Sequence, residues 1–152
     1  MRLFLGLISA PIMIFIFLVS LSGAADTFTI SKSSGGGFAA THHILSVNQD
    51  GVVTRKIISF VMPSQNNREE VVGKVNIEDA KHLYSRLRQI DFEKIEYHQP
   101  SNISASLGLT VNSKYYEVTW HGNPEEIKAV LDIYNEMTKL LAPIIDPITK
   151  KD

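Results

Sequence analysis

The first third of the chain after residue 25 alternates between apolar and polar positions, as β-strands do. This period of two predicts strands over residues 27–33 and 39–48. A β-branched, apolar stretch predicts a third strand over residues 52–62. The Asp50-Gly51 pair, which readily forms a tight turn, joins the second and third strands. We therefore expect three antiparallel strands in a row.

A polar segment follows at residues 63–74, and its charged and amide side chains show no strand or helix period. We expect it to form a loop that is long enough to carry function. Apolar residues at helical spacing then predict an amphipathic helix over residues 77–90, with Asn76 as its N-cap. Residues 91–100 lead out of this helix without a regular pattern.

The last part of the chain repeats this order of hairpin and helix. Alternation returns at residues 106–111 and 115–121, which predicts a second hairpin. Asn123 and Pro124 then form a typical helix start, with the proline at the first helical position. We expect this helix to end before Pro143, because proline cannot donate the hydrogen bond that continues a helix.

The predicted order of elements is βββ-α-ββ-α. Because the strands come in hairpins, we expect an α+β fold, a mostly antiparallel five-stranded sheet with both helices packed on one face. The domain would cover residues 26–145, followed by a short tail at 146–152.

Residues 1–25 have the layout of a secretory signal peptide. Arg2 precedes the almost wholly apolar stretch 3–21, and small residues follow, so that cleavage is expected after Ala24 or Ala25. An alternative is an uncleaved anchor, since the apolar stretch is long enough to span a bilayer. In both cases we expect an exported domain, periplasmic, secreted or anchored to the membrane.

Charge and cysteine content narrow the class of partner. The full chain has 152 residues with 15 basic and 16 acidic side chains. Residues 1–25 contribute only Arg2, so the remainder has 15 − 1 = 14 basic and 16 acidic residues. This balance gives no electrostatic reason to expect nucleic acid or an anionic membrane as a partner. Without cysteine the chain can form neither a disulfide nor a thiolate zinc site.

The sequence shows no recognisable catalytic or metal-binding pattern. It has no Gly-x-Ser-x-Gly elbow, and the adjacent His42 and His43 would point to opposite faces of a strand. We therefore expect no enzyme, no metal and no small-molecule cofactor. An unrecognised enzyme would require His42, His43 or His121 to meet acidic side chains in one cleft.

Two features suggest how the domain could bind a protein. The glycines of Gly35-Gly36-Gly37 join two predicted strands and are followed by Phe38, which does not fit a phosphate-binding loop. They could instead form a wide hairpin loop or a bulge. The second feature is one face of the last predicted strand, with three outward side chains, Tyr115, Glu117 and His121.

The glycine motif resembles the start of emfourin-type proteins, and the resemblance rests on the run Ser34-Gly35-Gly36-Gly37-Phe38-Ala39-Ala40 between two strands. The helix at 77–90, the strand at 107–111 and the proline-started helix at 124–141 match the family's layout. The resemblance implies a proteinaceous inhibitor of thermolysin-like zinc metalloproteases. It also implies that an exposed loop occupies the protease cleft, with partner-binding residues Gly36, Gly37, Phe38 and Ala39.

Two functions from different classes therefore stand at this point. The first is an exported, non-enzymatic inhibitor or binder of a secreted metalloprotease, acting through residues 36–39. The alternative is a periplasmic or cell-surface interaction module that binds a protein through the outer face of its sheet. The second requires that no helix covers the face that carries Tyr115, Glu117 and His121.

Overall fold

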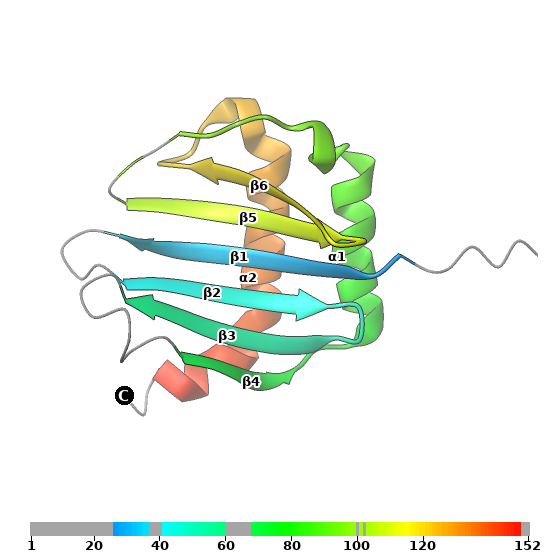
Figure 1. The fold of residues 1–152 in the computed structure, drawn as a ribbon, viewed down its shortest axis with the longest axis vertical. Coiled ribbons are helices and arrows are strands. Elements are labelled where there is room, and N and C mark those ends of the chain that lie inside the picture. Colours follow the sequence, from blue (N-terminus) through cyan, green and yellow to red (C-terminus); the bar gives the residue numbers. More distant parts are fainter. Residues whose placement is uncertain (1–25, 37–40, 60–67, 100, 102, 150–152) are drawn as a thin grey trace, which may run out of the picture.

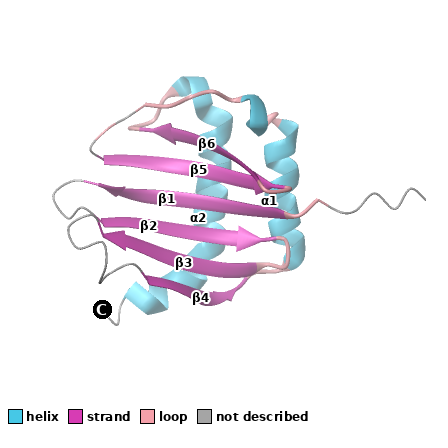
Figure 2. Cartoon of the chain, in the orientation of Figure 1, coloured by secondary structure: helices cyan, strands magenta, loops and turns pink. Residues whose placement is uncertain are grey.

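The fold is a six-stranded antiparallel sheet with two α-helices (Figures 1 and 2), seen in a computed structural model that describes residues 26–36, 41–59, 68–99, 101 and 103–149. The predicted α+β class is therefore confirmed. The strands are β1 (Phe28–Gly36), β2 (Thr41–Asn48), β3 (Val52–Ser59), β4 (Arg68–Lys74), β5 (Ile103–Val111) and β6 (Lys114–Trp120). The helices are α1 (Ile77–Gln89) and α2 (Lys128–Thr149), with 3-10 turns η2 (Phe92–Lys94) and η3 (Glu125–Ile127).

The first strand of the domain lies at the centre of the sheet. The strand order is β4-β3-β2-β1-β5-β6, so β1 has a hydrogen-bonded neighbour on each side (Figure 1). Ile30, for example, pairs with Val47 of β2 and with Leu109 of β5. The sheet therefore joins the two hairpin regions of the chain through β1.

Both helices lie behind the sheet in the view of Figure 1. α2 runs across the strands: Tyr134 makes an edge-to-face contact with Trp120 of β6, with ring centroids 5.1 Å apart. Near its other end, Ile144 lies against Gly73 of β4. α1 packs beside α2 and reaches the sheet where the Tyr84 ring stacks on Phe28 at 4.3 Å.

The hydrophobic core lies between the sheet and the helices. Its fully buried side chains come from both helices and from all strands except β4, as the predicted alternation and helical spacing require. The strands contribute Ile30, Val47, Val53, Leu107, Leu109 and Val118, and the helices contribute Ala80, Leu83, Leu87, Ile133, Met137 and Leu141.

The sixth strand, β4, corrects the prediction of a loop over residues 63–74. β4 is an edge strand, and charged side chains are common on edges because they discourage pairing with other chains. Its charges pair with those of β3: Glu70 lies 2.6 Å from Arg55, and Glu69 lies 3.7 Å from Lys56. This polar edge has the composition of a loop, which made the prediction wrong for residues 68–74.

Two element boundaries also differ from the prediction. β1 continues through Ser34 and Gly35 to Gly36, because β2 and β5 pair with it on both sides. α2 continues past Pro143 to Thr149, into the predicted tail. Pro143 is exposed, whereas Leu141 and Ile144 on either side pack against the core. The packing of these neighbours therefore outweighs the one helical hydrogen bond that proline removes.

The predicted signal peptide, residues 1–25, lies outside the described residues. Within the part of the chain that the structure describes, neither helix combines the length and the apolar character needed to cross a bilayer.

Candidate functional site

The face of the sheet turned away from both helices, which we call the open face, carries mostly small polar side chains. The strand register sets them in rows across the sheet. One row contains Glu117, Gly108, Ser31, Ser46, Thr54 and Val71, and the next contains Thr119, Ser106, Ser33, Ile44, Lys56 and Glu69. On the central strands β1 and β5 these side chains are serine or glycine, so the surface is low there.

Larger side chains of β6 and β2 flank these small residues of β1 and β5 on both sides. The result is a shallow hollow of about 170 Å³, which we call the trough. It is lined by Ser31, Ser33, His42, Ile44, Ser104, Ser106, Tyr115, Glu117 and Thr119. The β6 side chains form one wall, the β2 side chains form the other, and the serines form the floor.

A chain of hydrogen bonds connects the floor of the trough to the β6 wall. Ser106 Oγ donates to Glu117 Oε1 at 2.7 Å, and Tyr115 Oη donates to the same oxygen at 3.0 Å. Ser33 Oγ lies 2.8 Å from Ser106 Oγ. Because a hydroxyl has one proton and Ser106 gives its proton to the carboxylate, Ser33 must be the donor to Ser106. The four side chains therefore hold one another in fixed orientations.

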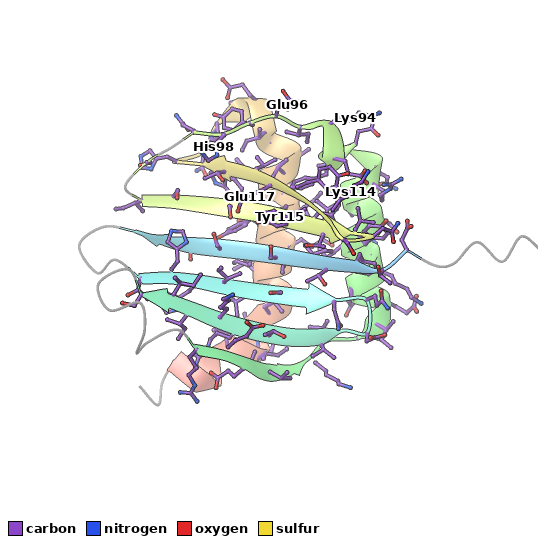
Figure 3. The ribbon with its side chains drawn as sticks, in the orientation of Figure 1. Lys94, Glu96, His98, Lys114, Tyr115 and Glu117 are labelled. Carbon is purple, nitrogen blue, oxygen red and sulfur yellow. The ribbon has the colours of Figure 1, made fainter. Side chains whose placement is uncertain are left out.

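Gly108 makes room for the Tyr115 side chain on the open face. A Cβ atom at residue 108 would lie 2.8 Å from Tyr115 Oη and 2.5 Å from Ser31 Oγ. Partial burial, followed by the nearby Glu117 carboxylate, raises the pKa of Tyr115 to about 12. Tyr115 is therefore a neutral hydrogen-bond donor near pH 7, and 58% of its surface is still exposed. Figure 3 shows Tyr115 and Glu117 together on the open face of β6.

The trough suits binding better than covalent catalysis. A serine beside a carboxylate can be a nucleophile, but Ser106 is only 5% exposed and lies between Ser33 and Glu117. A substrate would have little access to its hydroxyl. What the trough does offer is a row of hydroxyl groups, one carboxylate and an exposed aromatic ring.

The described histidines lie on several different elements of the fold. His42 pairs with Gly35 of β1, whereas His121 follows the end of β6, where its Nδ1 lies 3.0 Å from the Ile103 carbonyl oxygen. His82 pairs instead with Glu136 between the helices, with Nε2 3.2 Å from Oε1. No group of three histidine or acidic side chains in the described ranges is placed to hold a metal ion.

The predicted binding loop lies mostly outside the described residues. Gly36 is the last residue of β1 and pairs with Ile103 of β5. Gly37, Phe38 and Ala39 lie in the segment between β1 and β2 that the structure does not describe. The adjacent Gly35 has a packing reason for its identity, since a Cβ atom there would lie 2.5 Å from the Thr41 carbonyl oxygen.

Lys32 is an unexpected buried cation on the covered face, where it is 9% exposed. Its ammonium group lies 4.2 Å from the centre of the Tyr134 ring and donates a hydrogen bond to Thr138 Oγ1. Burial lowers the pKa of Lys32 to about 8. The signal was present in the sequence, because the alternation that starts at Phe28 and Ile30 places residue 32 on the inward face.

Sequence reasoning found part of the trough and missed the rest. Tyr115 and Glu117 were predicted to point outward, and the described helices leave their face open. Ser33, Ser106 and Gly108 were missed, because nothing local indicates that β1 pairs with β5. The small outward residues on both strands were the only available signal.

Comparison with known proteins does not identify a relative: no family model matches the chain, and no curated protein matches it. The likeness of residues 34–40 to the emfourins therefore stays a prediction.

Proposed function

We propose that this protein is a non-catalytic binding module that holds an extended segment of a partner protein in the trough on its open face. The observation that supports this most is the hydrogen-bonded group of Ser33, Ser106, Tyr115 and Glu117, on a sheet face that neither described helix covers. If the predicted leader at residues 1–25 directs export, the partner is met outside the cytoplasm.

The shape of the trough favours an extended partner. Its floor side chains recur at every second residue of β1 and β5, for example Ser31 and Ser33. This spacing of about 6.6 Å is also the repeat of an extended peptide. Hydroxyl groups can donate to and accept from the amides of such a segment.

The trough is also prearranged. Side chains that are already fixed lose little rotational freedom on binding, which leaves more of the contact energy for affinity. In this group Ser106 and Tyr115 both donate to one oxygen of Glu117, so a partner would meet a site with its orientation already set.

Photo-crosslinking tests this function. A diazirine amino acid is placed at Ile44, on the β2 wall of the trough, and in a control at Lys139, which is exposed on α2. We expect one defined partner protein from Ile44 and not from Lys139. The purified partner should then slow amide hydrogen exchange in β1 and β5. Equal crosslinking from both positions, or a partner that leaves these strands unprotected, would contradict the proposal.

Inhibition of a metalloprotease is the second candidate. It is favoured by the position of Gly36, the last residue of a strand whose partners β2 and β5 hold it on both sides. The predicted binding residues 37–39 therefore follow directly on a strand end that β5 holds by pairing with Gly36. Phe38→Ala should weaken inhibition of a thermolysin-like enzyme without unfolding the domain. Full protease activity at micromolar concentration of the unaltered protein would rule this candidate out.

A further inference from the structure

We infer that the Tyr115–Glu117 corner of the trough binds a basic side chain, a guanidinium or ammonium group, of the partner segment. The identification of the ligand as part of a protein rests on the proposed function. The preference for a cation rests on charge and geometry alone.

The first argument is the uncompensated charge of Glu117. The nine residues that line the trough include neither lysine nor arginine, and Glu117 takes its hydrogen bonds from two neutral hydroxyl groups. The two acidic residues of the edge strand β4 are different. Glu69 has Lys56 at 3.7 Å, and Glu70 has Arg55 at 2.6 Å. An exposed carboxylate with neither lysine nor arginine among the residues that line its trough favours a cationic ligand.

The second argument is the aromatic ring next to this carboxylate. Tyr115 is 58% exposed, and its hydroxyl is bonded to Glu117, so a cation that approaches the carboxylate also approaches the ring. Aromatic faces attract cations through the ring quadrupole. The covered face of the same sheet contains such a contact, in which the Lys32 ammonium lies 4.2 Å from the Tyr134 ring centre.

The chemistry of the corner selects among cations. A metal ion needs several oxygen ligands with negative charge, and Glu117 is the one acidic side chain in the trough lining. A guanidinium or ammonium group is satisfied by one carboxylate, neighbouring hydroxyl oxygens and an aromatic face. A nucleic acid would be repelled by Glu117. A basic side chain on an extended peptide meets all these conditions.

The test uses a defined peptide as the probe. The ¹⁵N-labelled protein is titrated with acetyl-Gly-Gly-Arg-Gly-Gly-amide and with the same peptide carrying neutral citrulline in place of arginine. We expect chemical-shift changes centred on Ser106, Tyr115 and Glu117, and binding about tenfold weaker for the citrulline peptide. Added salt should weaken binding of the arginine peptide only.

Two variants make the test specific. Glu117→Gln keeps an acceptor for Ser106 and Tyr115 but removes the charge, so it should abolish the preference for arginine. Glu69→Gln is the matched control, because Glu69 lies on the same face beside Lys56 and should leave the preference unchanged. Thermal unfolding followed by circular dichroism verifies that both variants are folded. Equal affinity for the two peptides, or equal effects of the two variants, would overturn the inference.

The results also separate this inference from the proposed function. Arginine-selective binding at Glu117 without a crosslinked partner would support the cation site and count against the protein-binding module. A crosslinked partner together with equal binding of both peptides would support the module and overturn the cation site.

Discussion

The two faces of the sheet are built from the same strands but carry different side chains, apolar on the covered face and mostly small and polar on the open face. On β5, Leu109 is fully buried under the helices, whereas Thr110 beside it points to the open face. On β1, Ile30 and Ser31 show the same contrast. Because successive side chains alternate, one strand can supply stability on one side and, under the proposed function, recognition on the other. The covered face should therefore respond to substitution through folding, and the open face, under the proposed function, through binding.

Each face has one kind of exception to this division. The covered face holds Lys32, a cation whose described partners are a neutral ring and a neutral hydroxyl. The open face has apolar side chains toward β4, of which Val71 is 67% exposed. Substitutions at Lys32 and Val71 therefore test whether each face tolerates a side chain that is unusual for it.

The largest effect is expected from neighbouring substitutions on β5. Leu109→Ala removes buried methyl groups and leaves a cavity, so it should lower the free energy of unfolding by about 2–5 kcal/mol. Thr110→Ala, one residue further on, should change it by less than about 0.5 kcal/mol. Urea unfolding measures both. Similar losses for the two variants would show that the faces are not divided in this way.

A glycine on the open face should show the next largest effect. Gly35→Ala would place its Cβ atom 2.5 Å from the Thr41 carbonyl oxygen and 2.9 Å from His42 Cα, both backbone atoms. Strands β1 and β2 would have to separate locally, at a cost of about 1–3 kcal/mol. The same urea experiment measures it. An unchanged midpoint would mean that this close approach does not restrict residue 35.

Removing the buried cation should stabilise the fold. Lys32→Met keeps most of the side-chain volume and avoids burying a charge, so we expect a gain of about 1–2 kcal/mol at pH 7. The gain is limited because the contacts with Tyr134 and Thr138 are lost. Lys32→Gln is the control, since it removes the charge but still buries a polar group. A loss of stability in Lys32→Met would show that the ring and the hydroxyl compensate the burial.

Lys32 also predicts a dependence of stability on pH. Its pKa is about 8 in the folded protein and 10.5 ordinarily, so between these values the unfolded chain binds more protons. Stability should therefore rise with pH from about 8 toward 10, by up to about 3 kcal/mol. Above pH 10 the raised pKa values of Tyr84 and Tyr115, each about 12, act in the opposite direction. Unfolding of the unaltered protein and Lys32→Met across pH 7.5–9.5 isolates the contribution of Lys32.

The smallest effect is expected at the edge of the open face. Val71→Thr replaces an exposed β-branched side chain with another, and it should change the free energy of unfolding by less than about 0.5 kcal/mol. Thermal unfolding measures it. A larger loss would indicate that Val71 is covered in solution, for example by a second copy of the chain.

The sequence was sufficient to predict the covered face. Ile30 and Leu109 follow period two, and Leu83 and Leu87 follow helical spacing, which is enough to place the core and the fold class. It was not sufficient for β4, because an edge strand needs no second buried face and can be as charged as a loop. The predicted helix end before Pro143 was also wrong, because the packing of Leu141 and Ile144 against the core outweighs the hydrogen bond that proline removes.

The trough could not be predicted in full, because no local sequence pattern shows which strands lie next to each other. Tyr115 and Glu117 could be assigned to one face by alternation alone. Their link to Ser33 runs through Ser106 and requires β5 to lie next to β1. A pairing between residues so far apart in the chain is set by the whole fold. The serines were therefore visible as polar strand residues but not as one site.

The central position of β1 has a consequence for the time at which the fold can be completed. One neighbour of β1, β2, is adjacent in the chain, but the other, β5, is joined only by closing a loop of about 65 residues between Gly36 and Ile103. During synthesis, strands β1 to β4 exist before β5 does, and β1 then forms an unpaired edge. The native sheet can thus form only after most of the chain has been made. Until then the polypeptide stays incompletely folded, and an incompletely folded chain can pass through a protein channel that is too narrow for a folded domain.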